Sequence, residues 1–240
     1  MISVKNKTKE SADAYLYEEI TSFDLFGGTS CKGFKDEIEA LGPIKHLNLF
    51  INSPGGDVFE GLAIANFLKR QKFDIDVYID GIAASIASAV AIGCGGRVHM
   101  YDSSIIMIHK AWCNCGGNAD ELRKIADQID ECDKSIFSMY KDAIKGKITD
   151  EELQEMIKAE TWLDASKCLE IGFCFDIIQE DRSIAAKIST EYCSRYVNIP
   201  KNLISEEAPN HNAELKKEEL PEDIKEIIAS AEHTLKALDY

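Results

Sequence analysis

Apolar and polar residues alternate in short segments along most of the chain, and longer segments of helical spacing separate them. In His46–Ser53, Leu47, Leu49 and Ile51 alternate with polar neighbours before Pro54 breaks the pattern, which is typical of a strand. Strands are expected over six segments: Ala14–Ile20, His46–Ser53, Ile75–Ile79, Arg97–Tyr101, Ser104–His109 and Phe173–Ile178.

Between these strands, apolar residues recur every three or four positions, which predicts helices with one buried face. Thr149 and Glu152 have the spacing of a capping box at the start of one helix. Helices are expected after Ser30, with Phe34, Ile38 and Leu41 on one face, and over Asp57–Arg70, Ala83–Ile92, Ala119–Lys145, Thr149–Lys158 and Ala165–Gly172. The repeated order of strand and helix predicts an α/β fold in which helices cover a sheet.

The composition changes after Gln179, where Glu, Lys, Asn and Pro become dominant. We expect a flexible N-terminal segment over residues 1–13, one domain over residues 14–179, and an acidic tail over residues 180–240. The tail should be partly disordered and end in an amphipathic helix, Asp223–Leu238. The tail is either solvated or provides a docking helix for a partner, and for Glu206–Leu220 the solvated interpretation is favoured.

Charge narrows the classes of function open to this chain of 240 residues. The formal net charge is −15, which argues against a general nucleic-acid binder and against docking on an anionic membrane. No apolar run reaches the roughly 20 residues that span a bilayer. The polar start, Met1–Lys9, lacks the apolar part of a signal peptide and favours the cytoplasm.

Eight cysteines give an even number, but a chain with this many core-forming residues does not need disulfides. Cys113 and Cys115 are separated by one residue, whereas paired zinc ligands are usually separated by two. We therefore expect free thiols, no metal and no cofactor.

A glycine pair lies between a predicted strand and a predicted helix. Gly55 and Gly56 let the backbone turn sharply and leave peptide N–H groups near the positive end of the helix that begins at Asp57. Such donors suit an oxyanion. The alternative is an ordinary turn, and for this motif taken alone the ordinary turn is favoured.

Ser85 lies after a strand and Gly81, near the first turn of a helix of small residues. This position is at the sheet edge where α/β proteins bind ligands, and the next peptide N–H, on Ile86, could join an oxyanion hole. Close helix packing is the alternative; it explains Ser88 and Ala89 better than Ser85.

His109 closes the apolar strand that ends in Ile108. It is either a satisfied core residue or a general base, because imidazole titrates near neutrality. A serine hydroxyl needs such a base, and the base needs a carboxylate to orient it. Glu160 and Asp164 are the candidates for that carboxylate.

Four segments, in this order, resemble the signature segments of the Clp protease proteolytic subunit. They are Ile51-Asn-Ser-Pro-Gly-Gly56, Gly81-Ile-Ala-Ala-Ser85, Met107-Ile-His109, and Glu160-Thr-Trp-Leu-Asp-Ala165 with Gly172-Phe173. The resemblance runs from about Ala14 to Ile178. Trp162 and the acidic tail are more similar to the phage branch of the family, the Clp-related head maturation proteases, than to the housekeeping enzyme.

The resemblance implies a serine endopeptidase with Ser85 as nucleophile, His109 as general base, and Gly55 or Gly56 with Ile86 as oxyanion donors. The family's third residue is normally Asp; the matching residue here is Glu160, with Asp164 as the alternative.

The resemblance also implies a spiral of β-β-α units and a homo-oligomeric ring or stacked rings, interlocked by the long helix. The substrate would be a polypeptide enclosed in a chamber, such as a capsid or scaffold protein, in the host cytoplasm or the prohead. An ATP-driven unfoldase is a further partner that the resemblance leaves open.

Two other functions compete with this interpretation. A crotonase-type acyl-CoA hydratase or isomerase shares the spiral fold and uses backbone N–H donors, but does not need a Ser85–His109 pair. A non-catalytic capsid scaffold protein would keep the fold with an inactive site. An esterase of the common hydrolase fold is disfavoured, because the chain lacks a Gly-x-Ser-x-Gly motif and its order of serine, histidine and acid differs.

Overall fold

The computed structural model describes residues 3–5, 8, 10–22, 28–179, 193 and 195–203. The predicted tail helix Asp223–Leu238 and the stretch Glu206–Leu220 lie outside these residues. Among the described helices, none combines the length and the apolar character that crossing a membrane requires.

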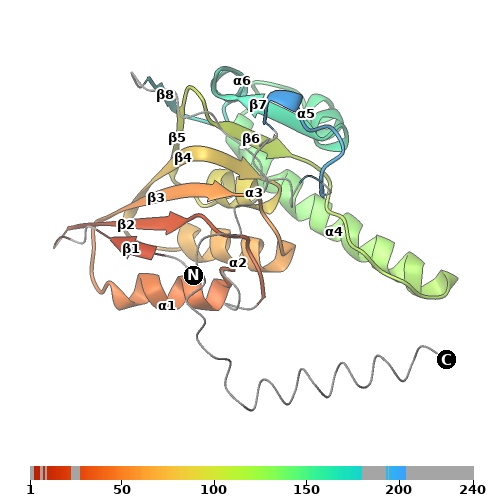
Figure 1. The fold of residues 1–240 in the computed structure, drawn as a ribbon, viewed down its shortest axis with the longest axis horizontal. Coiled ribbons are helices and arrows are strands. Elements are labelled where there is room, and N and C mark those ends of the chain that lie inside the picture. The colour runs from red at the N-terminus through yellow and green to blue at the C-terminus, as the bar shows by residue number, and fades with distance from the viewer. Residues whose placement is uncertain are drawn as a thin grey trace, which may run out of the picture. The chain divides into compact units, whose positions relative to one another are not determined.

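A mostly parallel sheet forms the centre of the domain, in the order β1-β2-β3-β4-β5-β8 (Figure 1). Among the described strands, only β1–β2 and β6–β7 pair antiparallel. The strands are β1 (Ser3–Lys5), β2 (Ser11–Leu16), β3 (His46–Ser53), β4 (Asp74–Ala84), β5 (Arg97–Tyr101), β6 (Ile105–Ile108), β7 (Thr161–Asp164) and β8 (Asp176–Ile178). This arrangement confirms the expected α/β fold.

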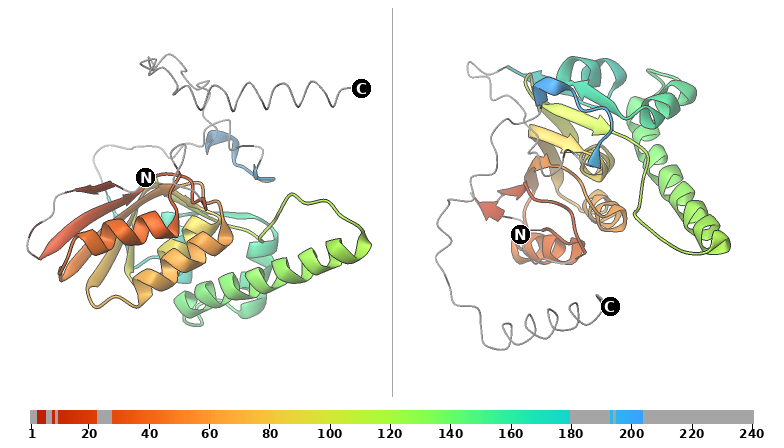
Figure 2. Two further views of the ribbon diagram at one scale, coloured as in Figure 1. Left: turned by 90° about the horizontal axis from the view of Figure 1, so that it is seen from below. Right: turned by 45° about the vertical axis from the view of Figure 1, so that its right-hand side comes forward.

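Helices cover one face of the sheet, where α1 and α2 lie side by side (Figure 2). The helices are α1 (Cys31–Ala40), α2 (Val58–Lys69), α3 (Ile86–Gly93), α4 (Ala119–Ile144), α5 (Asp150–Lys158), α6 (Ala165–Ile171) and the 3₁₀ turn η2 (Lys201–Leu203). Every residue of α3 is buried, which its small side chains permit because they allow close approach to α2 and α4. The alternating apolar residues of β2 and β3 supply the inner layer of this core.

The two halves of β4 pair with different neighbours, and this division positions the site. Asp76–Ile79 pairs with β5, whereas Ile82–Ala84 pairs with β6. The C-terminal end of β4 therefore lies between β3 and β6, and α3 begins directly after it. In a parallel arrangement the carboxyl ends of these strands meet at one edge, which is the usual place for a site in such sheets.

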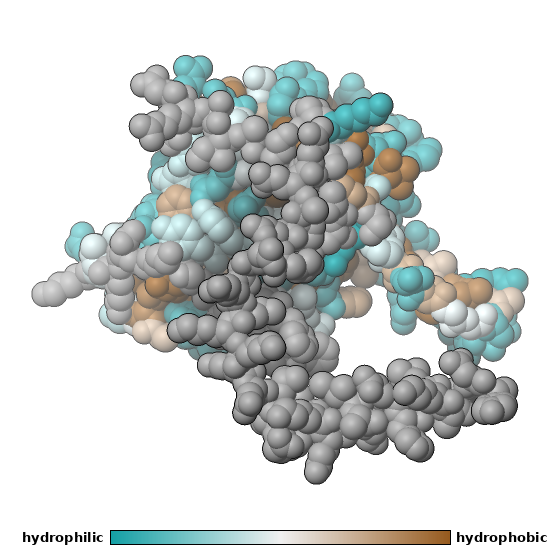
Figure 3. Space-filling model, viewed as in Figure 1, coloured by the Kyte–Doolittle hydropathy of each residue, from teal (hydrophilic) through white to brown (hydrophobic). Residues whose placement is uncertain are grey.

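The long helix α4 projects from the domain by its N-terminal half (Figures 1 and 2). Its C-terminal half is anchored by Ile136, Tyr140 and Ile144, which are buried in the core. The projecting half instead carries Leu122, which is 42% exposed, and the half-buried Ile125 and Ile129. Apolar surface is visible along it in Figure 3.

Several predicted boundaries were wrong. The first predicted strand, Ala14–Ile20, is β2 and begins at Ser11, and β1 pairs with it; both strands include residues expected to be flexible. β4 continues through Gly81 to Ala84, so α3 begins at Ile86 rather than Ala83, because Ala83 and Ala84 pair with β6. Strand β7 was not predicted; its residues are held by pairing with β6.

Candidate active site

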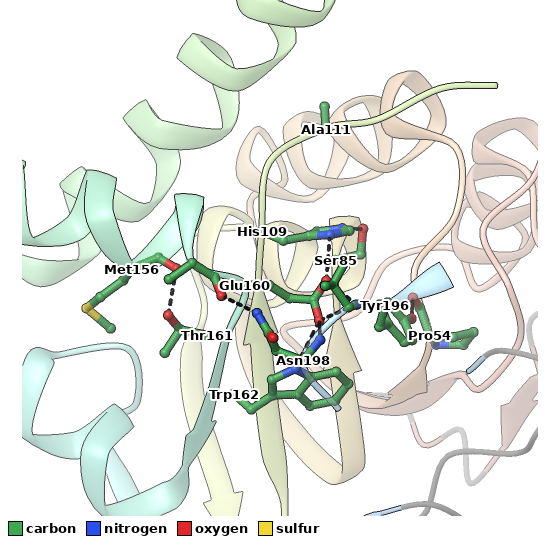
Figure 4. A network of polar contacts seen from close by, with 12 residues as sticks. Pro54, Ser85, His109, Ala111, Met156, Glu160, Thr161, Trp162, Tyr196 and Asn198 are labelled. Atoms are coloured by element: carbon green, nitrogen blue, oxygen red, sulfur yellow. Dashed lines mark hydrogen bonds and ion pairs between the residues drawn. The ribbon is translucent and has the colours of Figure 1, made fainter. Parts of the chain in front are cut away.

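Ser85 occupies the corner between β4 and α3 in a conformation that few side chains adopt. Its backbone has φ 55° and ψ −130°, outside the favoured regions for a residue with a Cβ. Its N–H donates to the carbonyl oxygen of Met107 on β6 (3.0 Å), which helps to hold the corner. The strained turn presents the hydroxyl away from the helix and toward His109 (Figure 4).

Glycines are required in the neighbouring turn because it lies against this corner. A Cβ on Gly55 would lie 2.6 Å from the oxygen of Ala84 and 2.8 Å from Cβ of Ser85. A Cβ on Gly56 would lie 2.0 Å from the oxygen of Ile20. Both glycines also have positive φ, 91° and 141°. No other residue fits either position without moving the backbone.

The expected oxyanion donors differ in their present partners. The N–H of Gly55 donates to Oγ of Ser53 (3.2 Å) and is already engaged. The bridge between Ile20 and Gly56 uses the N–H of Asp57 and the oxygen of Gly55, so the N–H of Gly56 lies outside that ladder. The N–H of Ile86 lies in the first turn of α3, where helix geometry provides no intrahelical acceptor. Gly56 and Ile86 are therefore better suited as donors than Gly55.

His109 follows β6 directly and is brought to the Ser85 corner by the pairing of β4 with β6. Its Nε2 lies 2.7 Å from Oγ of Ser85, a normal hydrogen-bond distance. Burial lowers the pKa of His109, and the nearby carboxylates of Glu160 and Asp133 oppose that effect only in part. The imidazole is therefore neutral at pH 7, so Nε2 can accept a proton from the hydroxyl.

The segment after His109 is fastened to α4. Asp133 accepts a hydrogen bond from the N–H of Ala111 (2.7 Å) and pairs with Lys110 (3.2 Å). Trp112, just beyond, is 56% exposed. This segment forms one wall of a cleft of about 300 Å³ that is also lined by Pro54, Gly56, Ser85, His109 and Tyr196.

Glu160 is the carboxylate nearest to the imidazole. It lies between α5 and β7 with φ 52°, and the residue is 8% exposed. Its Oε2 lies 3.9 Å from Nδ1 of His109, which is an ion-pair distance but too long for a direct hydrogen bond. Trp162 also points its indole N–H at Oε1, at 3.4 Å (Figure 4).

Asp164 lies at the other end of β7. The antiparallel register places Thr161 opposite Ile108 and Asp164 opposite Ile105, so Asp164 is three residues further from His109 along the strand pair. Its carboxylate caps α6 by accepting from the N–H of Lys167 (2.7 Å). The geometry therefore brings Ser85, His109 and Glu160 together and leaves Asp164 outside the group.

A second set of residues at this site was not predicted from sequence patterns. Arg195, Tyr196, Val197 and Asn198 were assigned to the tail, yet they contact the cleft and Glu160. The ring centroid of Tyr196 lies 6.1 Å from that of His109. No local pattern in these residues could have predicted such contacts, because their partners lie 37 or more positions earlier in the chain.

Comparison with known proteins agrees with this geometry. The family model described as Clp protease matches residues 37–181, more than half of the chain. This chain belongs to the Clp protease family. The fold and the matched range fit that assignment, and the region around Glu160 lies within the match.

Similar proteins include several ATP-dependent Clp protease proteolytic subunits. The one from Streptococcus mutans is 29% identical over 147 residues, covering 60% of this chain and 74% of the relative. That from Porphyromonas gingivalis is 27% identical over 146 residues, covering 60% and 65%. Subunit 1 from Prochlorococcus marinus is 30% identical over 150 residues, covering 60% and 72%.

Proposed function

We propose that this protein is a serine endopeptidase in which Ser85 is the nucleophile and His109 the general base. The observation that carries the proposal is the 2.7 Å contact between Nε2 of His109 and Oγ of Ser85, within a cleft at the sheet edge. Membership of the Clp protease family supports serine peptidase activity independently of this distance.

The proposed reaction begins with attack of Oγ of Ser85 on a peptide carbonyl carbon. His109 takes the hydroxyl proton at Nε2 and later gives it to the leaving amine, so the peptide C–N bond breaks and an acyl-enzyme remains. The N–H groups of Gly56 and Ile86 would stabilise the negative oxygen of the tetrahedral intermediate. Water, deprotonated by the same imidazole, then releases the acid and restores Ser85.

In this mechanism Glu160 stabilises the imidazolium that forms when His109 holds the proton. It can do so by charge across 3.9 Å in a buried site, where such an interaction is screened less than in water. A modest shift of the carboxylate would bring Oε2 into hydrogen-bond range of Nδ1, and catalytic hydrogen bonds often tighten only when substrate is bound.

The test of the activity compares the full chain with Ser85→Ala on unfolded casein and on a short fluorogenic peptide. The proposal predicts peptide fragments from the wild type and none from the variant, with equal melting temperatures. Turnover of an acyl-CoA by both proteins, without peptide cleavage, would favour the crotonase-type alternative instead. Inactivity of both toward all substrates would favour the scaffold alternative.

We further propose that the chain works as a homo-oligomeric ring or as stacked rings. The projecting half of α4 supports this, because Leu122, Ile125 and Ile129 lie along a helix that has left the domain core. A projecting apolar stripe is typical of a surface covered by another subunit. Light scattering should report an assembly of several chains at micromolar concentration, and an active monomer would contradict the proposal.

The finer proposal for the substrate is a capsid or scaffold protein, processed in the cytoplasm or the prohead. Its support is the resemblance of Trp162 and of the acidic tail over residues 180–240 to the phage branch of the family. Co-expression with candidate capsid proteins should yield shortened products with the wild type but not with Ser85→Ala. The relatives' names include "ATP-dependent", so an ATP-driven unfoldase is a proposed partner for folded substrates.

A further inference from the structure

The carboxylate of Glu160 receives its closest hydrogen bonds from a distant part of the chain. The N–H of Val197 lies 2.8 and 2.9 Å from its two oxygens, and the N–H of Asn198 lies 2.6 Å from Oε1. By contrast, His109 lies 3.9 Å away. A buried carboxylate needs such donors, because without them its charge is costly to desolvate. We call residues 195–203 the strap.

The strap is anchored to the domain by contacts that do not involve Glu160. Arg195 forms a two-bond ion pair with Glu19, at 2.6 and 3.1 Å. The hydroxyl of Tyr196 donates to the carbonyl oxygen of Pro54 (2.6 Å), next to the glycine turn. The side-chain amide of Asn198 donates to the carbonyl oxygen of Ala159 (2.9 Å).

Apolar packing reinforces these anchors. Tyr196 and Leu203 are buried, at 8% and 6% exposed, in a small cluster with Ile82, Ala84 and Met107. The rings of Tyr196 and Trp162 meet edge to face at 5.3 Å. These contacts hold the strap against the domain independently of Glu160, so its peptide N–H groups are already in position to donate to the carboxylate.

A glutamate in this position needs more restraint than an aspartate would. Glu has one more methylene and one more rotatable bond, so its carboxylate can turn away from the imidazole more easily. The strap supplies that restraint from outside the range that matches the Clp protease family, residues 37–181. The strap therefore binds the same carboxylate that the additional methylene makes more mobile.

We infer that the strap is a positioning element of the active site, in which the peptide N–H groups of Val197 and Asn198 hold the Glu160 carboxylate beside Nδ1 of His109. This inference rests on the proposed serine peptidase function. It assigns a role in the reaction to residues 195–198, which lie outside the matched range. Within this segment, the peptide N–H groups of Val197 and Asn198 act through Glu160 rather than on Ser85 or the substrate carbonyl.

Val197 permits a clean test because the residue is 87% exposed, so its side chain contributes little packing. Val197→Pro removes the N–H donor, whereas Val197→Ala keeps it and serves as the matched control. Reaction of Ser85 with a fluorophosphonate probe is followed in the full chain, since its second-order rate constant depends on the activated serine and not on substrate binding. Melting temperatures show whether each variant is folded.

We expect Val197→Pro to react roughly 10- to 100-fold more slowly than wild type, as is typical of a misplaced catalytic group, and Val197→Ala to react within about twofold of wild type. The same comparison, Asn198→Pro against Asn198→Ala, tests the second donor, the N–H of Asn198, in parallel. The decisive comparison repeats the Val197 pair in a Glu160→Ala background. There Val197→Pro should cause no further slowing, because the carboxylate that the strap positions is gone.

Two results would overturn the inference while leaving the proposed function intact. In the first, Val197→Pro reacts as fast as Val197→Ala or faster, which would show that the N–H of Val197 does not assist the reaction or that it slows it. The slowing could also persist in the Glu160→Ala background, which would show a general structural role. A wild-type protein that is not labelled at Ser85 would instead refute the proposed function, and the inference with it.

Discussion

Ser88, which lies one helical turn after Ser85, forms a buried hydrogen bond of 2.7 Å with Tyr140. The hydroxyl of Ser88 also donates to the carbonyl oxygen of Ser85 (2.5 Å), so the phenol of Tyr140 must donate to Ser88. Burial raises the pKa of Tyr140, which keeps the phenol protonated for that role. Ser88 thus ties the strained corner to α4 and is structural, although it lies in the same small-residue segment.

The first prediction follows from this division of roles between the two serines. Ser88→Ala should keep probe labelling at Ser85 but lose about 1 to 3 kcal/mol of unfolding free energy, because the buried hydroxyl of Tyr140 loses its acceptor. Urea unfolding measures this loss. Adding Tyr140→Phe should recover part of the loss, since both polar groups are then absent. A fully stable but inactive Ser88→Ala would reverse the assignment.

The second prediction concerns the glycine turn against the nucleophile corner. Gly55→Ala places a methyl group 2.6 Å from the oxygen of Ala84 and 2.8 Å from Cβ of Ser85, so the corner must shift. A displacement of this kind should lower kcat/KM for a short peptide by roughly 100-fold. Gly116→Ala is the matched control, because no atom lies within 4 Å of its new Cβ. Equal rates for the two variants would show that the turn does not position Ser85.

The third prediction is a pH profile. His109 must be neutral to accept the proton, and burial lowers its pKa below the ordinary value near 6.5. Peptide hydrolysis should therefore stay active at pH 6.5 and fall only at lower pH. Glu160 and Asp133 favour the charged imidazole, so Glu160→Gln should move the acid limb of the profile to still lower pH. Initial rates between pH 8 and pH 5 test this, and a limb above pH 7 would contradict it.

The fourth prediction distinguishes the roles of the two carboxylates at the ends of β7, Glu160 just before it and Asp164 as its last residue. Glu160→Gln keeps the shape but removes the charge beside His109, so the hydrolysis rate should drop by roughly 100-fold or more. Asp164→Ala removes the cap of α6 and should cost about 1 kcal/mol of stability with a small effect on rate. Rates and melting temperatures of both variants decide the matter. The opposite pattern would assign the catalytic carboxylate to Asp164.

Local patterns in the sequence predicted that Ser85 and His109 lie at strand ends, which is where the structure places them. Ser85 and His109 each follow a strand, and strand ends are marked by alternation and by glycine or small residues. Because parallel strands end at one edge of the sheet, these side chains could be expected to meet. The 2.7 Å contact between them agrees with that expectation.

The preference for Glu160 over Asp164 came from the resemblance to the family, and local patterns in the sequence did not decide between them. In the structure the choice depends on the antiparallel register of β6 and β7, which sets Thr161 rather than Asp164 beside the end of β6. That register results from tertiary packing, and β7 itself has only four residues. Short strands of this kind are formed by their partner more than by their own propensity.

The strap was missed for a related reason. Tyr196 and its neighbours follow a segment of tail-like composition, and their partners Glu19, Pro54 and Glu160 are distributed over most of the domain. Sequence periodicity predicts helices and strands, but it does not predict an irregular segment whose two peptide N–H groups donate to a distant carboxylate. Such contacts emerge only once the sheet and its loops are assembled.

The most direct test of the proposed chemistry is peptide mapping by mass spectrometry after reaction with a fluorophosphonate. We expect one adduct per chain, located on Ser85, absent from Ser85→Ala and formed much more slowly in His109→Ala. Failure of the wild-type protein to react, or an adduct located on Ser88 or another serine, would contradict the proposed chemistry.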